Sequence, residues 1–156
     1  GISMPLFTQG RLPGLSPNGR QIAFLLGEKV LLYQLETGAY REICQLGDVK
    51  SLLWSPCGGY IAIETEAKIK LYNIKTGEFM ADVSGQKPSW SSDGKLLTYT
   101  QKAAEDSTEI YALEMDSLTH ELLVESGHED AAIHWSSKGK TMAHNGNGIL
   151  NIITWR

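Results

Sequence analysis

Short apolar runs alternate with turn-forming residues along the chain, and this pattern repeats four times. The turn-forming stretches begin at Leu15, Trp54, Trp90 and Trp135. The apolar runs that follow them are Ile22–Phe24, Ile61–Ile63, Leu97–Tyr99 and Met142–His144. A second run carries an aromatic residue at Tyr33, Tyr72 and Tyr111, and Ile152 lies near the equivalent place in the fourth copy. Features that recur together about every 40 residues are the signature of a repeat architecture.

Each copy predicts four strands joined by tight turns. In turns such as Ser16-Pro17-Asn18-Gly19, Pro fixes φ, Gly supplies a positive φ, and Asn or Asp binds nearby backbone. The runs between the turns are rich in Val, Ile, Leu, Tyr and Thr, which favour strands. Residues 69–74 carry apolar side chains on both faces, as expected of a sheet covered on both sides. The chain is therefore predicted to be all-β, with antiparallel four-stranded sheets.

The copies are predicted to span residues 12–46, 47–84, 85–126 and 127–156 of one domain. The fourth copy has room for only three strands, near 131–135, 140–144 and 149–155. Met4–Thr8 is an additional apolar segment before the first copy. Because an unpaired apolar edge invites aggregation, we expect this segment, from its own chain or a partner chain, to supply the missing outer strand.

A sheet with two apolar faces needs neighbours, and radial stacking of four such sheets produces a β-propeller. The stretch Trp54-Ser55-Pro56-Cys57-Gly58, with Ile61-Ala62-Ile63 and the Leu-Tyr-x-Ile pattern at 71–74, resembles the TolB-type propeller repeat, a relative of the WD repeat. The resemblance covers roughly positions 12 to 155. It departs from the family at Leu15, where the other copies have Trp, and the Gly-His and Trp-Asp signatures of WD repeats are absent.

Four copies leave three ways of completing a ring. Propellers have about four to eight blades. One chain could close by itself, two chains could form an eight-bladed ring with twofold symmetry, or the chain could be part of a longer protein. Four blades would need a steep angle between neighbours, so we favour the two-chain ring.

Composition narrows the function classes. The 156 residues are 42% hydrophobic and 21% charged, which is ordinary for a globular domain. The net charge of −4 is spread without runs, so the basic surface of a nucleic-acid-binding protein is not expected. No apolar stretch approaches the roughly 18 residues that span a bilayer, and the compartment, cytoplasm or periplasm, stays open. Cys44 and Cys57 are predicted to be unpaired thiols, because their spacing is not that of a CxxC site.

The aromatic positions have a structural interpretation. Trp54, Trp90 and Trp135 are expected to pack as wedges between neighbouring sheets, where each indole N–H needs only one acceptor. Tyr33, Tyr72 and Tyr111 are given the same role. His144 replaces an apolar residue of the repeat, so we expect it to make a hydrogen bond in the core, and His120 is expected to be exposed.

The densest group of potential metal ligands is His128, Glu129, Asp130 and His134. Its His-x5-His spacing is not the HExxH of metalloproteases, so we expect a solvated loop and no metal or other cofactor. No GxSxG, P-loop or GxGxxG motif occurs, so no catalytic residue is predicted. The prolyl-oligopeptidase relatives of this repeat keep their catalytic triad in a separate hydrolase domain, and the resemblance therefore implies no enzyme activity for these residues.

The resemblance also implies a binding surface, because propellers usually bind through the loops that enter their innermost strands. These loops are Gln45–Lys50, Ser84–Pro88 and Ser126–Ile133. Their mixed charges suit a polar protein–protein contact. The leading hypothesis is a non-enzymatic scaffold, favoured as a homodimeric ring, that binds a protein partner through Asp48, Lys50, Lys87, His128, Glu129, Asp130 and His134. The alternative is an enzyme or a receptor for a small ligand or metal, which would use the axial channel.

Overall fold

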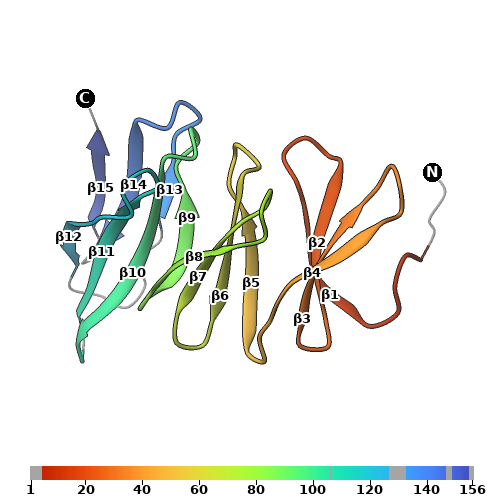
Figure 1. Ribbon diagram of the computed structural model, residues 1–156. Helices are drawn as coiled ribbons and strands as arrows, with labels where there is room; N and C mark the ends of the chain where they lie inside the picture. The colour runs from red at the N-terminus through yellow and green to blue at the C-terminus, as the bar shows by residue number, and fades with distance from the viewer. Residues whose placement is uncertain (1–4, 106, 127–132, 147–148, 155–156) are drawn as a thin grey trace.

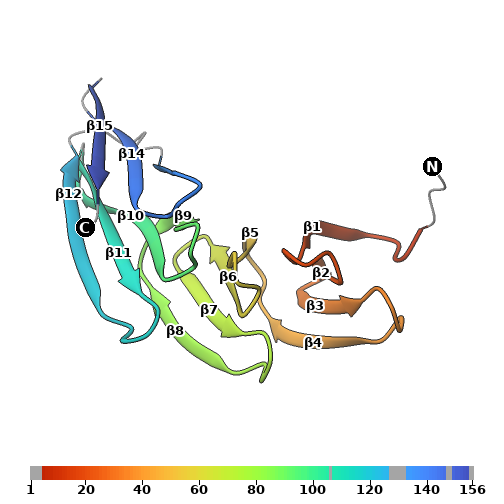
Figure 2. The same cartoon turned by 90° about the horizontal axis from the view of Figure 1, so that it is seen from above.

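Four antiparallel sheets stand side by side along an open arc in the computed structural model, which describes residues 5–105, 107–126, 133–146 and 149–154 (Figures 1 and 2). In every sheet the spatial order of the strands follows the sequence. The described residues contain no helix long and apolar enough to cross a membrane.

Each sheet is formed by strands that are consecutive in the sequence. The first sheet contains β1 (Gly10–Leu15), β2 (Gln21–Leu26), β3 (Lys29–Gln34) and β4 (Tyr40–Gln45). The second contains β5 (Val49–Trp54), β6 (Tyr60–Thr65), β7 (Ile69–Asn73) and β8 (Phe79–Val83). The third contains β9 (Gln86–Trp90), β10 (Leu96–Ala104), β11 (Ser107–Glu114) and β12 (His120–Ser126). Within the described ranges, the fourth contains β13 (Ile133–Trp135), β14 (Thr141–Gly146) and β15 (Ile149–Thr154).

The N-terminal segment does not complete the fourth sheet of its own chain. The described part, Pro5–Gln9, is not in a strand and lies at the opposite end of the arc from β15 (Figure 2). The Phe7 ring packs instead on the first sheet, with its centroid 4.7 Å from that of Phe24 and 5.7 Å from that of Tyr33. Its apolar ring finds a partner in the exposed face of the nearest sheet, and this corrects the expectation of a latch strand within one chain.

The turn before each second strand is built as its sequence predicts. The glycine closing each turn has a positive φ, between 67° and 72°, and its N–H donates to the carbonyl of the serine three residues earlier. In the first and third turns the serine hydroxyl donates to the side chain of the residue before the glycine: Ser16 to Asn18 at 2.8 Å and Ser91 to Asp93 at 2.7 Å.

These turns also stack from sheet to sheet. A Cβ on Gly58 would lie 3.7 Å from Pro17, and one on Gly94 would lie 3.5 Å from the Cys57 sulfur. A Cβ on Gly139 would lie 3.0 Å from the backbone nitrogen of Asp93. The turns therefore form a continuous row along one edge of the arc. A Cβ added to Gly19, in the first turn, would have no atom within 4 Å.

The third turn gives a pH-dependent prediction. Burial raises the pKa of Asp93, but hydrogen bonds from Ser91 and from the N–H of Lys95 outweigh it and hold the pKa below its usual 3.8. A carboxyl group whose pKa is lowered by folding stabilises the fold at pH values above its unfolded-state pKa. This stabilisation is lost as the pH falls through the folded-state pKa. Asp93→Asn keeps the acceptor, as Asn18 shows in the first turn. Between about pH 7 and about pH 3, the free energy of unfolding measured in urea should therefore fall less for this variant than for the unmodified protein. Equal losses for both proteins would contradict this assignment.

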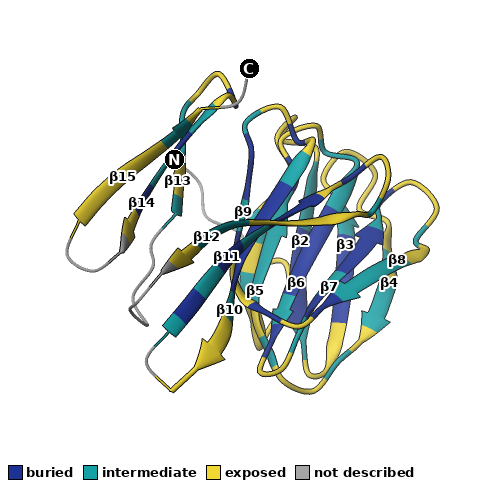
Figure 3. Ribbon diagram, turned by 90° about the vertical axis from the view of Figure 1, so that its left-hand side faces the viewer, coloured by how far each residue is buried: buried dark blue, intermediate teal, exposed yellow. Residues whose placement is uncertain are grey.

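The core lies between the sheets rather than inside any one of them. Ala23, Leu25, Val30 and Leu32 of the first sheet pack against Ile61 and Ile63 of the second. Ala62, Ile69 and Leu71, on the other face of the second sheet, pack against Trp90, Leu97 and Tyr99 of the third. Between the third and fourth sheets, Ile110 and Met142 are both fully buried. Buried residues accordingly concentrate on the central strands of the first three sheets (Figure 3).

The three tryptophans that begin repeat turns, Trp54, Trp90 and Trp135, lie at these boundaries and use their indole N–H groups in the same way. Trp54 donates to the carbonyl of Gly14 at 2.9 Å, and Trp90 donates to that of Leu53 at 3.3 Å. Trp135 donates to the Thr98 hydroxyl, which in turn donates to the carbonyl of Ser89. Each tryptophan therefore reaches, directly or through one hydroxyl, the residue just before the preceding repeat anchor.

The strand register corrects one equivalence drawn from spacing alone. Tyr33 lies opposite Ile22 and Tyr72 lies opposite Ile61. In the third sheet, however, the counterpart opposite Leu97 is Leu113, whereas Tyr111 lies opposite Tyr99 and stacks on it at 5.7 Å. The longer β10–β11 hairpin shifts the register by two residues. In the fourth sheet the equivalent residue, opposite Met142, is Ile153, and Ile152 points to the other face.

Cys44 and Cys57 are both free thiols. Burial raises the pKa of the Cys44 thiol, which lies beside Tyr72.

Candidate functional site

The loops that enter the inner strands lie along one edge of the arc, the lower edge in Figure 1, together with the β6–β7 turn. This edge is called the rim below. Antiparallel order places them there, because every second connection of a sheet returns to the same edge. The rim holds Asp48, Lys50 and Lys87, whereas His128, Glu129 and Asp130 lie outside the described residues. His134, on β13, is exposed.

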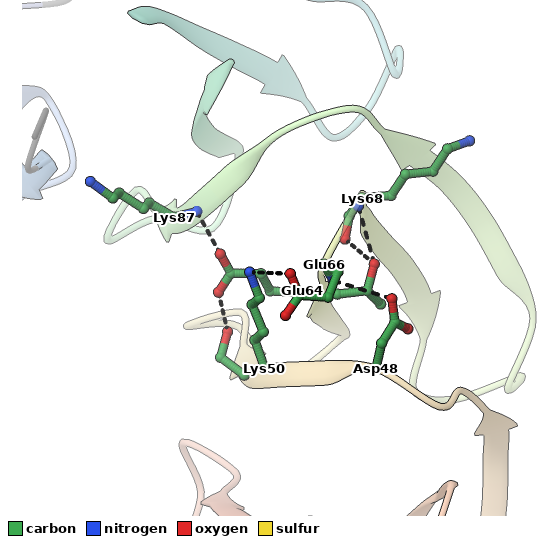
Figure 4. A network of polar contacts seen from close by, with 8 residues as sticks. Asp48, Lys50, Glu64, Glu66, Lys68 and Lys87 are labelled. Atoms are coloured by element: carbon green, nitrogen blue, oxygen red, sulfur yellow. Dashed lines mark hydrogen bonds and ion pairs between the residues drawn. The ribbon is translucent and has the colours of Figure 1, made fainter. Parts of the chain in front are cut away.

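Two of the predicted rim residues meet at the β6–β7 turn (Figure 4). The Lys50 ammonium lies 3.0 Å from a carboxylate oxygen of Glu66, and the two side chains are 38% and 69% exposed. The carboxylate of Asp48 accepts a hydrogen bond from the Glu66 N–H at 3.3 Å. Exposed ion pairs of this kind stabilise a fold by about 0–1 kcal/mol, so their charges remain available to a partner.

Glu64 joins this group to the next sheet, and the sequence pattern did not single it out. One carboxylate oxygen accepts a hydrogen bond from the Ser51 hydroxyl at 2.7 Å, and the other accepts one from the backbone N–H of Lys87 at 2.8 Å. The Lys87 side chain extends away from this carboxylate (Figure 4). Its place in the repeat could have indicated it, because Glu64 on β6 is a charged residue at the position where β2 has the buried Leu25.

Lys87 has a left-handed backbone, with φ of 53°. Such a conformation is uncommon for a residue other than glycine and costs on the order of 1 kcal/mol. The hydrogen bond from its N–H to Glu64 holds it there. The backbone of the third sheet's entry loop is therefore fixed by a side chain of the second sheet.

Beside Lys87 lies a pocket of about 590 Å³, lined by the third sheet and its entry loop together with Ala67 of the β6–β7 turn. Lys87 and Lys102 line it together with Gln86, Gln101 and Thr108. The lining includes Gly85, where an added Cβ would lie 2.4 Å from the Tyr99 ring and 2.8 Å from the carbonyl oxygen of Thr100. The entry loop therefore sits closer to β10 than any side chain would allow.

The remaining histidines do not gather at the rim. His144 is 4% exposed, and among the described residues its Nδ1 has no hydrogen-bond partner, so the expected core hydrogen bond is not formed at that atom. His120 is exposed as predicted, and its Nδ1 lies 2.8 Å from the Tyr99 hydroxyl. Burial raises the pKa of that hydroxyl to about 12. No three His, Cys, Asp or Glu side chains within the described ranges are placed to hold a metal ion.

Comparison with solved structures identifies the architecture. A TolB from Acinetobacter baumannii is 20% identical with a TM-score of 0.62, and the match covers 91% of this chain and 42% of that one. The propeller domain of the Trilobed protease from Pyrococcus furiosus is 16% identical with a TM-score of 0.71, covering 94% of this chain and 54% of that one. The fold is half of a β-propeller.

A solved structure named as a peptidase also matches this chain. Dipeptidyl peptidase 4 from Porphyromonas gingivalis is 13% identical with a TM-score of 0.75, and the match covers 97% of this chain and 32% of that one. No family model matches the sequence, and no curated protein matches it. The chain spans about half the length, or less, of the structures it resembles. The likeness therefore establishes the half propeller, and the TolB-type assignment stays a resemblance.

Proposed function

We propose that this protein is a non-enzymatic interaction scaffold that binds a protein partner through the rim. The observation that carries the proposal is the exposed group of opposite charges formed by Asp48, Lys50 and Glu66, next to the Lys87 loop and its pocket. Charges at the edge of an interface guide association and select partners. The fixed backbone at Lys87 would let such a surface bind without reordering, which favours affinity.

The ring in which this scaffold works is proposed to contain two chains and eight blades. Among the similar structures are a chain of a mitotic checkpoint complex, of which this chain covers 46%, and the Cps50 (Swd1) propeller domain from Myceliophteria thermophila, of which it covers 52%. Two copies of a half ring supply the blades of one whole ring.

The rim proposal is tested by affinity capture with matched charge variants. Asp48→Ala with Lys50→Ala removes one charge of each sign from the rim. Lys75→Ala with Glu78→Ala removes the same charges from the exposed β7–β8 turn on the opposite edge. For a partner captured by the unmodified chain, calorimetry should show about tenfold weaker binding to the rim variant and unchanged binding to the control. Equal affinities for the two variants would place the contact elsewhere.

A further inference from the structure

The last sheet leaves one apolar face uncovered. On β15, Leu150 is 74% exposed and Ile152 is 68% exposed. Ile152 lies opposite Ala143, a position whose counterparts in the first two sheets are Leu32, opposite Ala23, and Leu71, opposite Ala62. Leu32 is 1% exposed and Leu71 is fully buried, because in each case the following sheet covers them.

Leu150 follows the same rule. It lies opposite Asn145, and the residues at the same register in the first three sheets are Val30, Ile69 and Ile110. All three have no exposed surface. The fourth copy therefore carries aliphatic side chains at positions that are buried wherever another sheet follows.

The first sheet is open on its opposite face. Leu15 holds the place of the wedge tryptophans and is 62% exposed. A pocket of about 220 Å³ lies on the same face, lined by Phe7, Ile22, Phe24 and Tyr33 among others. The counterparts of Ile22, Phe24 and Tyr33 in the second sheet, Ile61, Ile63 and Tyr72, pack against the preceding sheet.

We propose that a second copy of this chain binds these two faces head to tail. Leu150 and Ile152 of each chain pack into the pocket beside Leu15 of the other, at two identical junctions related by a twofold axis. The inference names the contacts of the two-chain ring proposed above and rests on it. It also replaces the latch strand with face-to-face packing, in which Phe7 forms a wall of the receiving pocket.

Two observations favour a second copy over an unrelated partner. Where one sheet follows another, the face that packs on the preceding sheet carries Ile61, Ile63 and Tyr72 in the second sheet, and the first sheet carries Ile22, Phe24 and Tyr33 at the same register. The row of turns also continues across the junction. Lys138, which holds the place of Asp93, would lie against the partner's Gly19, whose surroundings are open.

Charge substitutions on the two faces test the proposal by sedimentation. Leu15→Asp and Ile152→Asp each place a carboxylate in both junctions, so each variant alone should dissociate at least about a hundredfold more readily than the unmodified dimer. Both sites are solvent-exposed within one chain, and thermal melts by circular dichroism confirm folding. Phe79→Asp, on the 52% exposed β8 position away from both faces, is the matched control and should leave the mass unchanged.

Mixing the two variants gives the decisive result. An equimolar mixture leaves one junction free of substitutions, so it should recover a species of twice the 17.2 kDa chain mass. The proposal would be overturned if the mixture stayed monomeric or if either single variant remained dimeric. It would also be overturned if the unmodified chain had a mass of 17.2 kDa at every concentration or formed open-ended polymers. The Asp48→Ala, Lys50→Ala variant should keep the dimer mass, so failure of the rim and failure of the junction are separate results.

Discussion

Trp90→Ala is expected to lower the free energy of unfolding by about 3–5 kcal/mol, as measured by urea denaturation. Trp90 is 8% exposed and lies between the second and third sheets. Its indole donates to the Leu53 carbonyl and stacks on Tyr60 at 6.5 Å. Truncation removes this packing and the hydrogen bond to Leu53, and it leaves a cavity in the core between the two sheets.

The control for this prediction is Phe79→Ala on the second sheet. Phe79 is also aromatic but is 52% exposed, so its truncation should cost within about 1 kcal/mol. Similar losses for the two variants would show that the tryptophan does not act as a wedge between sheets.

Gly85→Ala is expected to cost about 3 kcal/mol, the upper part of the range for overpacking. The new methyl group would lie 2.8 Å from the Thr100 carbonyl oxygen and 2.4 Å from the Tyr99 ring. The first contact is with backbone inside a paired strand, and Tyr99 is 3% exposed, so neither atom can move away at small cost.

Gly47 provides a matched control in the preceding entry loop. Its added Cβ would have only the exposed Glu28 side chain nearby, at 3.5 Å. Gly47→Ala should therefore change the stability by less than about 1 kcal/mol, with a gain from reduced freedom of the unfolded chain. Equal unfolding midpoints for the two variants would contradict the close approach of the 84–85 loop to β10.

Local chemistry explains which parts of the fold could be predicted from sequence. The turns at Asn18 and Asp93 carry their own hydrogen-bond partners within a few residues, so their positions and the strand boundaries follow directly. The register of Tyr111 could not be read from spacing, because the length of the β10–β11 hairpin decides which residues face each other.

The sequence predicted those parts of the candidate site that consist of charged side chains in a loop, and it did not predict contacts between distant residues. Asp48 and Lys50 were found as charges in an entry loop. The contact between Glu64 and Lys87 joins residues 23 apart through a backbone N–H, and no side-chain pattern encodes it. The sequence predicted Phe7 to be part of a strand, but its ring packs on Phe24 of the first sheet. The sequence alone does not show which sheet lies nearest to this segment.

Side-chain footprinting with a radical label, followed by mass spectrometry, shows whether a second copy covers the two open faces of the arc. At concentrations where the chain is dimeric, Leu150 and Ile152 should be labelled less than in the Leu15→Asp variant, in which both stay in solvent. Leu15 should likewise be labelled less than in the Ile152→Asp variant. Phe79 should be labelled equally in both, as the internal standard. Equal labelling of Leu150 and Ile152 in the unmodified chain and in the Leu15→Asp variant, after scaling to Phe79, would show that no neighbouring sheet covers β15.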